Sequence, residues 1–155
     1  MATYGLGAAE VLALRLEDVE WQAGRLQVCR PKTGARIELP LLPAVARALA
    51  TYLTAERPPQ APARRLFVSR PLPLRPLTSG AIRHRLRHYA RLAGIARPVI
   101  GAHALRHSHA SRQIDAGANP QVVGAILGHR RPASTSVYIR VALRRLRTVA
   151  LPVPT

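Results

Sequence analysis

The sequence predicts a mainly α-helical α+β domain with one small β-hairpin near its N-terminal part. Two kinds of local pattern support this fold class. Several stretches repeat apolar residues at helical spacing and end at a glycine, and one pair of short segments alternates apolar and polar residues around a turn sequence. A length of 155 residues suits one domain with its own core, so we expect a single domain over residues 1–155.

The first half of the chain predicts a hairpin with one helix before it and one helix after it. Residues 8–16 indicate a short helix, with Val11, Leu12 and Leu16 on one face and Leu14 off it. Two strands follow at about 25–30 and 36–41, and the turn Pro31-Lys32-Thr33-Gly34 places Lys32 at the hairpin tip. Residues 42–56 indicate the next helix, with Pro43 in its first turn.

The second half predicts a short buried extended piece at 66–68 and then a series of helices. Thr78 or Ser79 can cap a helix that runs to about residue 93. A helix over 103–116 ends at Gly117, and the next begins at Asn119-Pro120 and stops at Gly128. Its expected core face is Val122, Val123, Ile126 and Leu127. A last short helix, capped by Ser134 or Thr135, contains Tyr138.

The charge balance indicates a polyanionic partner. The chain has 24 basic and 7 acidic residues, a formal net charge of +17. Nucleic acid is the usual polyanion that neutralises such a chain, because phosphate contacts supply affinity for any sequence. An anionic membrane is the alternative, but no basic amphipathic helix with a Trp-, Phe- or Leu-rich face stands out, so we expect double-stranded DNA and no membrane partner.

Other bulk features favour a cytoplasmic protein. Cys29 is the single cysteine, so no intramolecular disulfide can form, and we expect it to be a small buried apolar residue. The N-terminus lacks a signal pattern, and no stretch reaches the roughly 18 apolar residues of a membrane span. All basic residues except Lys32 are arginines, which for most positions reflects a biased genome.

Three local patterns carry chemistry. In His103-Ala-Leu-Arg106-His107 the imidazoles and the guanidinium share one helix face, because they are three and four residues apart. Leu127-Gly128-His129 places a histidine just past a helix end, and Tyr138 follows nine residues later. Alone, Tyr138 between Val137 and Ile139 would be a core residue, but the two preceding boxes favour a functional role.

With these three boxes the chain resembles the tyrosine recombinase or phage integrase family, in particular the catalytic domain of its XerC/XerD-like members. The match is nearly continuous from residue 103 to 141. The Pro-Lys-Thr-Gly hairpin resembles the one that carries a catalytic lysine in the family, and Gly5-Leu6 with Glu10 resembles its first box.

The resemblance implies site-specific DNA recombination or integration through a 3′-phosphotyrosyl intermediate. Tyr138 would be the nucleophile, Arg106 and His129 would bind the phosphate, His103 would assist proton transfer, and Lys32 would protonate the leaving 5′-oxygen. No cofactor and no metal are expected, because cationic side chains neutralise the phosphate and the covalent bond conserves its energy. The family also suggests a homo-oligomer on DNA, for which Leu143, Leu146 and Val149 could serve, or they could pack on their own core.

One position departs from the family pattern. The first box normally reads Gly-Leu-Arg, and its arginine is a second phosphate clamp, whereas this chain has Gly7 there. Arg15 is eight residues further on and is not an obvious substitute. We also expect the chain to lack the separate N-terminal DNA-clamping (core-binding, SAM-like) domain. An alternative function is therefore an impaired DNA-binding remnant that binds duplex DNA or pairs with an intact recombinase.

Three further interpretations concern the histidines and the basic helices. A helix-turn-helix repressor over 105–127 is a third alternative, but it leaves Lys32 and Tyr138 unexplained. His103 and His107 have a metal-pair spacing, but no Glu or Cys pair accompanies them, so we expect no zinc site. Arg83, Arg87 and Arg91 lie four residues apart and indicate either a phosphate-contacting face or a solvated one.

Overall fold

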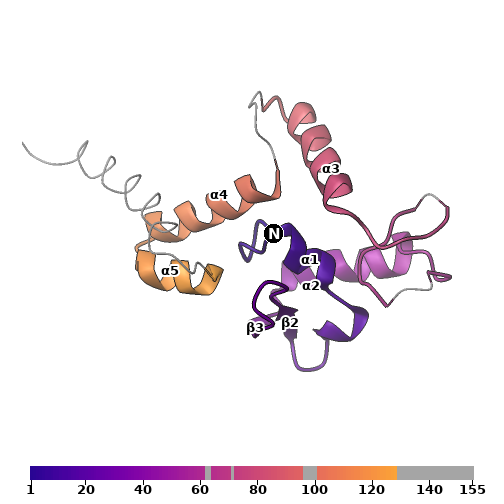
Figure 1. Ribbon diagram of the computed structural model, residues 1–155, viewed down its shortest axis with the longest axis horizontal. Coiled ribbons are helices and arrows are strands. Elements are labelled where there is room, and N and C mark those ends of the chain that lie inside the picture. The colour runs from indigo at the N-terminus through magenta and orange to yellow at the C-terminus, as the bar shows by residue number, and fades with distance from the viewer. Residues whose placement is uncertain (62–63, 71, 96–100, 129–155) are drawn as a thin grey trace, which may run out of the picture. The chain divides into compact units, whose positions relative to one another are not determined.

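The computed structural model describes residues 1–61, 64–70, 72–95 and 101–128. The chain divides into two compact units. One unit is Gly7–Ala102, and the other combines Met1–Leu6 with the described residues from 103 to 128. Figure 1 shows the helices and strands of each unit. In the described residues there are five α-helices and one small antiparallel sheet, which agrees with the predicted α+β class.

The sheet of the Gly7–Ala102 unit is built on the predicted hairpin. Strands β2 (Arg25–Cys29) and β3 (Arg36–Pro40) pair in antiparallel fashion, with Val28 opposite Ile37. A two-residue strand that the sequence did not predict, β1 (Val19–Glu20), adds to the other side of β2. Alternation along β2 buries Leu26 and Val28, so this face of the sheet belongs to the core.

Helix α1 (Ala8–Ala13) is shorter than the predicted 8–16. The chain leaves the helix at Leu14, whose ψ is 139°, and a single 3-10 turn follows at Leu16–Asp18. The carboxylate of Asp18 accepts a hydrogen bond from the Arg15 backbone N–H at 2.7 Å, which starts this new turn. Leu14, expected off the apolar face, is buried because it lies beyond the helix rather than on it.

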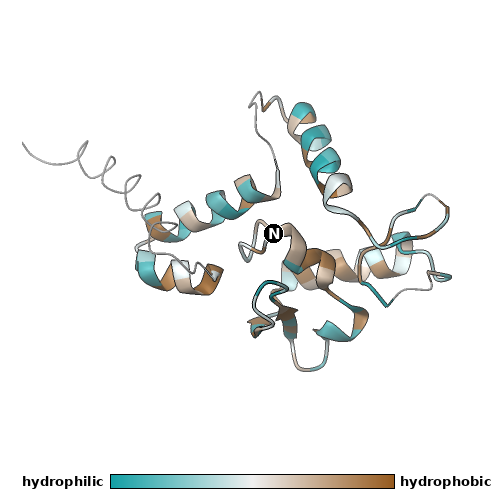
Figure 2. Cartoon of the chain, in the orientation of Figure 1, coloured by the Kyte–Doolittle hydropathy of each residue, from teal (hydrophilic) through white to brown (hydrophobic). Residues whose placement is uncertain are grey.

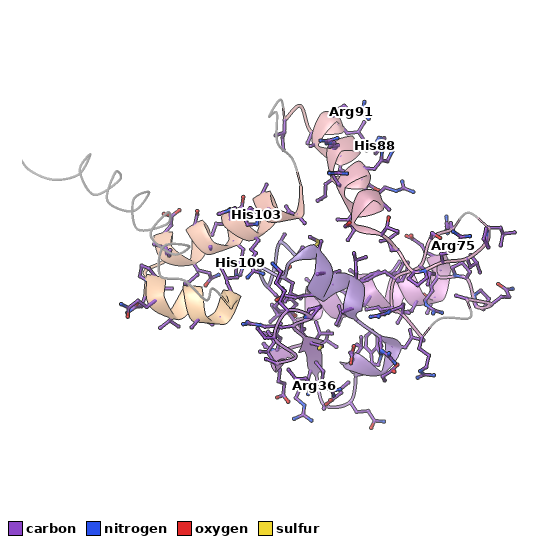
Figure 3. The ribbon with its side chains drawn as sticks, viewed as in Figure 1. Arg36, Arg75, His88, Arg91, His103 and His109 are labelled. Atoms are coloured by element: carbon purple, nitrogen blue, oxygen red, sulfur yellow. The ribbon has the colours of Figure 1, made fainter. Side chains whose placement is uncertain are left out.

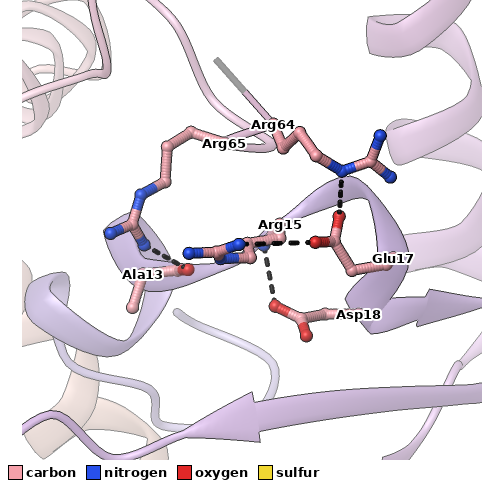
Figure 4. A network of polar contacts seen from close by, with 6 residues as sticks. All are labelled: Ala13, Arg15, Glu17, Asp18, Arg64 and Arg65. Carbon is pink, nitrogen blue, oxygen red and sulfur yellow. Dashed lines mark hydrogen bonds and ion pairs between the residues drawn. The ribbon is translucent and has the colours of Figure 1, made fainter.

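The extended piece after residue 63 attaches to the end of α1. The Leu66 N–H donates to the Leu14 carbonyl at 2.9 Å, and Leu66 is fully buried. Figure 4 shows that Arg65 donates to the Ala13 carbonyl and that Glu17 accepts from Arg64 Nε. The second of these bonds is 3.2 Å long. These contacts confirm the predicted buried segment at 66–68, although it forms isolated bridges and not a strand.

The predicted helix over 42–56 forms as two pieces. Helix α2 (Pro43–Thr51) starts with proline in its first turn, and a π-helical turn, η2 (Tyr52–Glu56), continues it. The Tyr52 hydroxyl accepts a hydrogen bond from the Val68 backbone N–H at 3.1 Å, so this turn is bonded to the buried extended segment. Leu49 is the buried residue of α2.

Helix α3 (Ser79–Leu92) has the ends that the sequence predicts. The Thr78 hydroxyl accepts from the Ala81 N–H at 3.2 Å, which identifies Thr78 as the N-cap. Gly94 adopts a φ of +66° just past the other end. Most of the helix is hydrophilic, as its teal colour in Figure 2 shows, and Ala90 is its buried residue.

The other unit contains α4 (Ala102–Asp115) and α5 (Pro120–Leu127). The Asn119 side chain caps α5, and Gly128 ends it with a φ of +71°, as predicted. Their shared core is Ala110, Val123 and Leu127, with Ile114 and Ala118 packed against it.

The predicted core face of α5 is wrong for two of its four residues. Val122 and Ile126 are 54% and 53% exposed, whereas Val123 and Leu127 are buried. Each pair is spaced by four residues, so the two pairs form neighbouring rows about 100° apart on the helix. Eight residues make little more than two turns, and α4 covers the Val123 row.

The N-terminal residues belong to this same unit. Gly5 is buried, with a φ of +65°, and a Cβ built on it would lie 2.6 Å from Leu127 Cδ2 and 2.7 Å from His109 Cδ2. Arg112 Nη2 also donates to the Ala2 carbonyl at 3.1 Å. Residues 1–6 are therefore packed on α4 and α5, and only glycine fits at position 5.

Candidate active site

The predicted site residues fall into three groups. His103 and Arg106 lie on α4, in the unit that also contains α5. Gly7 and Lys32 lie in the Gly7–Ala102 unit, at the start of α1 and in the β2–β3 turn. His129 and Tyr138 lie outside the described residues, so their predicted roles rest on the sequence.

The structure brings His103, Arg106 and His107 together on α4. The rings of His103 and His107 meet edge to face, with centroids 4.1 Å apart. The pKa of His107 is lowered, first by burial and then by the positive charge of His103 and Arg106. The lowered pKa favours the neutral form of His107, whose ring packs against that of His103. Figure 3 shows His103 near the start of the helix.

Arg106 is held by the end of α5. Its Nη2 donates a hydrogen bond to the carbonyl oxygen of Leu127, and the side chain is partly buried. Leu127 is the first residue of the Leu-Gly-His box, so two of the three boxes meet at this contact. A guanidinium fixed at one nitrogen keeps its planar fork in one orientation, which favours bidentate binding of an oxyanion.

Lys32 is exposed in a tightly bonded turn. The Arg30 N–H donates to the Ala35 carbonyl at 2.8 Å, and the Arg30 carbonyl accepts from Thr33 and Gly34 N–H at 3.0 and 2.9 Å. Gly34 takes a φ of +70°, which this turn requires. The prediction of Lys32 at the hairpin tip is confirmed.

The start of α1 carries an ion pair that the sequence did not reveal. Glu10 Oε2 accepts a hydrogen bond from the Gly7 N–H at 2.7 Å, and Glu10 Oε1 lies 3.8 Å from Arg30 Nε. The spacing of three residues from Gly7 to Glu10 is a recognisable helix-start signal. No local sequence pattern predicts that Arg30 forms this ion pair, because its partner Glu10 is 20 positions away in the sequence.

Arg15 does not lie with this group. Its guanidinium pairs with Glu17 (Figure 4). The two charged groups are 3.5 Å apart, and the Arg15 side chain is 55% exposed. This placement agrees with the expectation that Arg15 is not an obvious substitute for the arginine that the family has at position 7.

The three arginines Arg83, Arg87 and Arg91 are exposed along α3. The ion pairs found among the described residues all use other arginines: Arg15, Arg25, Arg30 and Arg64. Figure 3 shows Arg91 and His88 on this helix. The row is thus available to an external anion, and its role remains a prediction.

Several residues lie apart from these groups. Cys29 was expected to be buried and is exposed, because it alternates with the inward-facing Val28 at the end of β2. Asp115 is exposed, and His109 packs beside Gly5. Within the described ranges, no cluster of three His, Cys, Asp or Glu side chains could hold a metal, and no helix is long and apolar enough to cross a membrane.

Comparison with known proteins gives the family. Residues 1–145 match the phage integrase family. The chain is 41% identical over 158 residues to y4rA of Sinorhizobium fredii, named as an integrase/recombinase, and 38% identical over 157 residues to y4gC of the same organism, named likewise. Both alignments cover 99% of the chain. It is 32% identical over 146 residues to the tyrosine recombinase XerD of Proteus mirabilis, covering 94% of the chain.

Solved structures show the same fold. The chain superposes on the XerA recombinase with a TM-score of 0.79 and 26% identity, covering 99% of the chain and 55% of XerA. A XerH recombinase structure gives a TM-score of 0.79 at 21% identity, covering 96% of the chain and 42% of that protein. The fold is that of a tyrosine recombinase catalytic domain, and the chain belongs to the phage integrase family.

The extent of these matches limits what they transfer. The chain spans 37% of y4rA and 46% of XerD, against 79% of y4gC. Activities and partners of the whole relatives are therefore proposals for this chain.

Proposed function

We propose that this chain carries out site-specific DNA strand cleavage and rejoining, as the catalytic part of a tyrosine recombinase that acts in the cytoplasm. The observation that supports it best is the hydrogen bond from Arg106 to the Leu127 carbonyl. It joins the His-x-x-Arg box to the residues that lead directly into His129. A packing role alone would not need a guanidinium at the meeting point of two family boxes.

The proposed reaction is a transesterification. Tyr138 Oη forms a bond to phosphorus while the bond from phosphorus to the 5′-oxygen breaks, which leaves a 3′-phosphotyrosyl link. The tyrosine proton passes toward His103. The 5′-oxygen keeps the electron pair of the broken P–O bond and takes a proton from Lys32. Attack by a 5′-hydroxyl of a partner strand reverses the step, so no nucleotide cofactor is consumed.

Phosphate binding falls to Arg106 and His129. Charge on the non-bridging oxygens grows as the tyrosine attacks, and preorganised donors stabilise that charge. Arg83, Arg87 and Arg91 on α3 would contact the DNA backbone away from the cleaved bond, which adds affinity but no sequence reading. Recombination also requires two DNA partners, so we propose a homo-oligomer, or pairing with another recombinase, on DNA.

The alternative function is a DNA-binding remnant without strand cleavage. The observation that favours it is Gly7, which supplies no side chain where the family has an arginine. Loss of one preorganised cation costs on the order of a hundredfold in rate or more. The remnant would still bind duplex DNA by its basic surface.

A covalent trapping experiment separates the two functions. The chain is incubated with a library of nicked duplexes that have a randomised central segment, and protein–DNA bands that resist detergent are recovered and sequenced. A band that is absent in Tyr138→Phe supports the recombinase. A band from Gly7→Arg, with none from the native chain, supports the remnant. If neither protein gives a band, the proposed chemistry is wrong.

A further inference from the structure

We infer that Arg30 supplies the second phosphate-binding guanidinium that position 7 lacks. The inference rests on the proposed function and assigns a further residue to the same site. It draws on contacts within the Gly7–Ala102 unit only.

The first observation is that one carboxylate links Arg30 to position 7. Glu10 accepts from the Gly7 backbone N–H through Oε2, at 2.7 Å, and pairs with Arg30 Nε through Oε1, at 3.8 Å. A single side chain thus spans from the glycine to the arginine. The Arg30 guanidinium lies next to the start of α1, although it comes from the end of β2 and not from the helix.

The second observation is burial. The side chains of Arg30 and Glu10 are 16% and 13% exposed, whereas those of the paired arginines Arg15, Arg25 and Arg64 are 55%, 46% and 68% exposed. Arginine is seldom this buried, and a buried ion pair adds little net stability, because desolvation offsets the attraction. A fixed cation in a confined position is better explained by an anion that it binds there.

The third observation is that Arg30 and Lys32 belong to one turn. The Arg30 carbonyl accepts from the N–H groups of Thr33 and Gly34, at 3.0 and 2.9 Å, so the backbone on both sides of Lys32 is fixed. The non-bridging oxygens and the 5′-oxygen are bonded to the same phosphorus. One rigid turn would therefore serve both, with Lys32 at the leaving oxygen and Arg30 at a non-bridging oxygen.

The Glu10 contact does not prevent this role. A guanidinium has five N–H donors in a planar fork, more than one carboxylate contact through Nε can use. The carboxylate attracts the guanidinium to the start of α1 by charge, with Oε1 3.8 Å from Nε, and the proposed phosphate contact uses the Nη groups. Glu10 is thus a positioning residue, and Arg30 is the proposed phosphate ligand.

The test uses the cleaved sequence recovered from the randomised library, with either a normal phosphodiester or a neutral methylphosphonate at the scissile position. Arg30→Ala is expected to slow covalent complex formation on the phosphodiester by about a hundredfold or more. On the methylphosphonate the same variant is expected to change the rate little, because the charge that Arg30 neutralises is absent. Gly7→Arg in the Arg30→Ala background is expected to restore the rate on the phosphodiester.

Arg36→Ala is the matched control, because Arg36 is the exposed arginine paired with Cys29 across the same hairpin. The inference is overturned if Arg30→Ala slows both substrates equally, if it matches Arg36→Ala, or if Gly7→Arg restores nothing. Should Arg30→Ala unfold, the double variant Glu10→Gln with Arg30→Met replaces it, since it leaves no unpaired buried charge. The same substrate comparison then applies.

A native chain that gives no covalent band contradicts the proposed function, but Arg30 is still tested by binding. Fluorescence anisotropy with a labelled nicked duplex then compares Arg30→Ala with Arg36→Ala. A clearly larger loss of affinity in Arg30→Ala supports a phosphate ligand at Arg30. Equal losses of affinity in the two variants overturn the inference about Arg30.

Discussion

Arg106 on α4 donates a hydrogen bond to the carbonyl oxygen of Leu127, the last residue of α5. The two residues are 21 positions apart, and the bond holds the guanidinium at the C-terminal end of a helix. The C-terminal end of a helix carries partial negative charge, so a cation is favoured there. The residue that we propose to bind the scissile phosphate is therefore oriented before any DNA arrives.

Arg106→Lys is expected to slow covalent complex formation by about a hundredfold or more, because an ammonium cannot bond the Leu127 carbonyl and two phosphate oxygens in one plane. The measurement is the rate of covalent band formation on the nicked duplex. Arg112→Lys is the control, since Arg112 also lies on α4 and also donates from Nη2 to a carbonyl. A similar loss in both variants would contradict the assigned role.

Lys32→Ala is expected to lower the cleavage rate by about a hundredfold or more, because a general acid contributes that much or more at a poor leaving group. Replacing the leaving 5′-oxygen by sulfur should remove most of this defect, since a thiolate leaves without a proton. Lys32→Arg tests charge alone, because arginine does not give up its proton. If the arginine variant is fully active, Lys32 binds charge and does not transfer a proton.

Gly5→Ala is expected to destabilise the fold by about 2–5 kcal/mol. Part of that cost is the left-handed backbone, and part is a Cβ placed against Leu127 and His109. Gly24→Ala is the matched control, because its φ is +63° and nothing lies within 4 Å of its Cβ position. It should cost only about 1–2 kcal/mol. Urea denaturation followed by circular dichroism measures both, and equal losses would show that the close contact has no effect.

The lowered pKa of His109 predicts that the folded chain loses stability at mildly acidic pH. Burial lowers its pKa below the ordinary 6.5, a backbone hydrogen bond to Ala2 opposes this, and Arg112, the N-terminus and Arg106 lower it further. As the pH falls below about 6.5, the unfolded chain binds the proton first, so stability declines until the folded state also binds it.

Thermal denaturation between pH 7 and 5 measures this effect of His109. The native chain should lose stability over that range, and His109→Gln should lose less. His84→Gln is the control, because His84 is exposed on α3. An unchanged pH profile in the His109 variant would exclude it as the source.

The α3 row is tested by the salt dependence of duplex binding. Changing Arg83, Arg87 and Arg91 together to Gln should reduce the slope of log affinity against log salt by roughly 2–3, because each lost phosphate contact contributes about 0.9. The control changes Arg15, Arg25 and Arg64, which are paired with carboxylates and are equal in charge. Equal slopes for the two triple variants would indicate a solvated face.

Local signals explain which parts of the fold the sequence could predict. Caps and helix ends at Thr78, Asn119 and Gly128 depend on a few neighbouring residues, and all three formed as expected. The exit of the chain at Leu14 depends on bonds to the segment after residue 63, so the predicted helix over 8–16 was too long.

The candidate site divides in the same way. His103, Arg106 and Lys32 follow from short motifs, and the structure confirms their places on α4 and in the hairpin turn. The Glu10–Arg30 pair joins positions 20 residues apart and has no motif, so only the fold reveals it. The exposure of Cys29 likewise depends on which face of β2 the core covers.

Cys29 makes the hairpin directly observable. It is the single thiol of the chain, it is exposed, and it precedes Arg30 at the end of β2. A fluorophore or spin label attached through maleimide chemistry would modify this one position without any cysteine having to be removed. The label would report in real time on the turn that holds Arg30 and Lys32 as DNA is added.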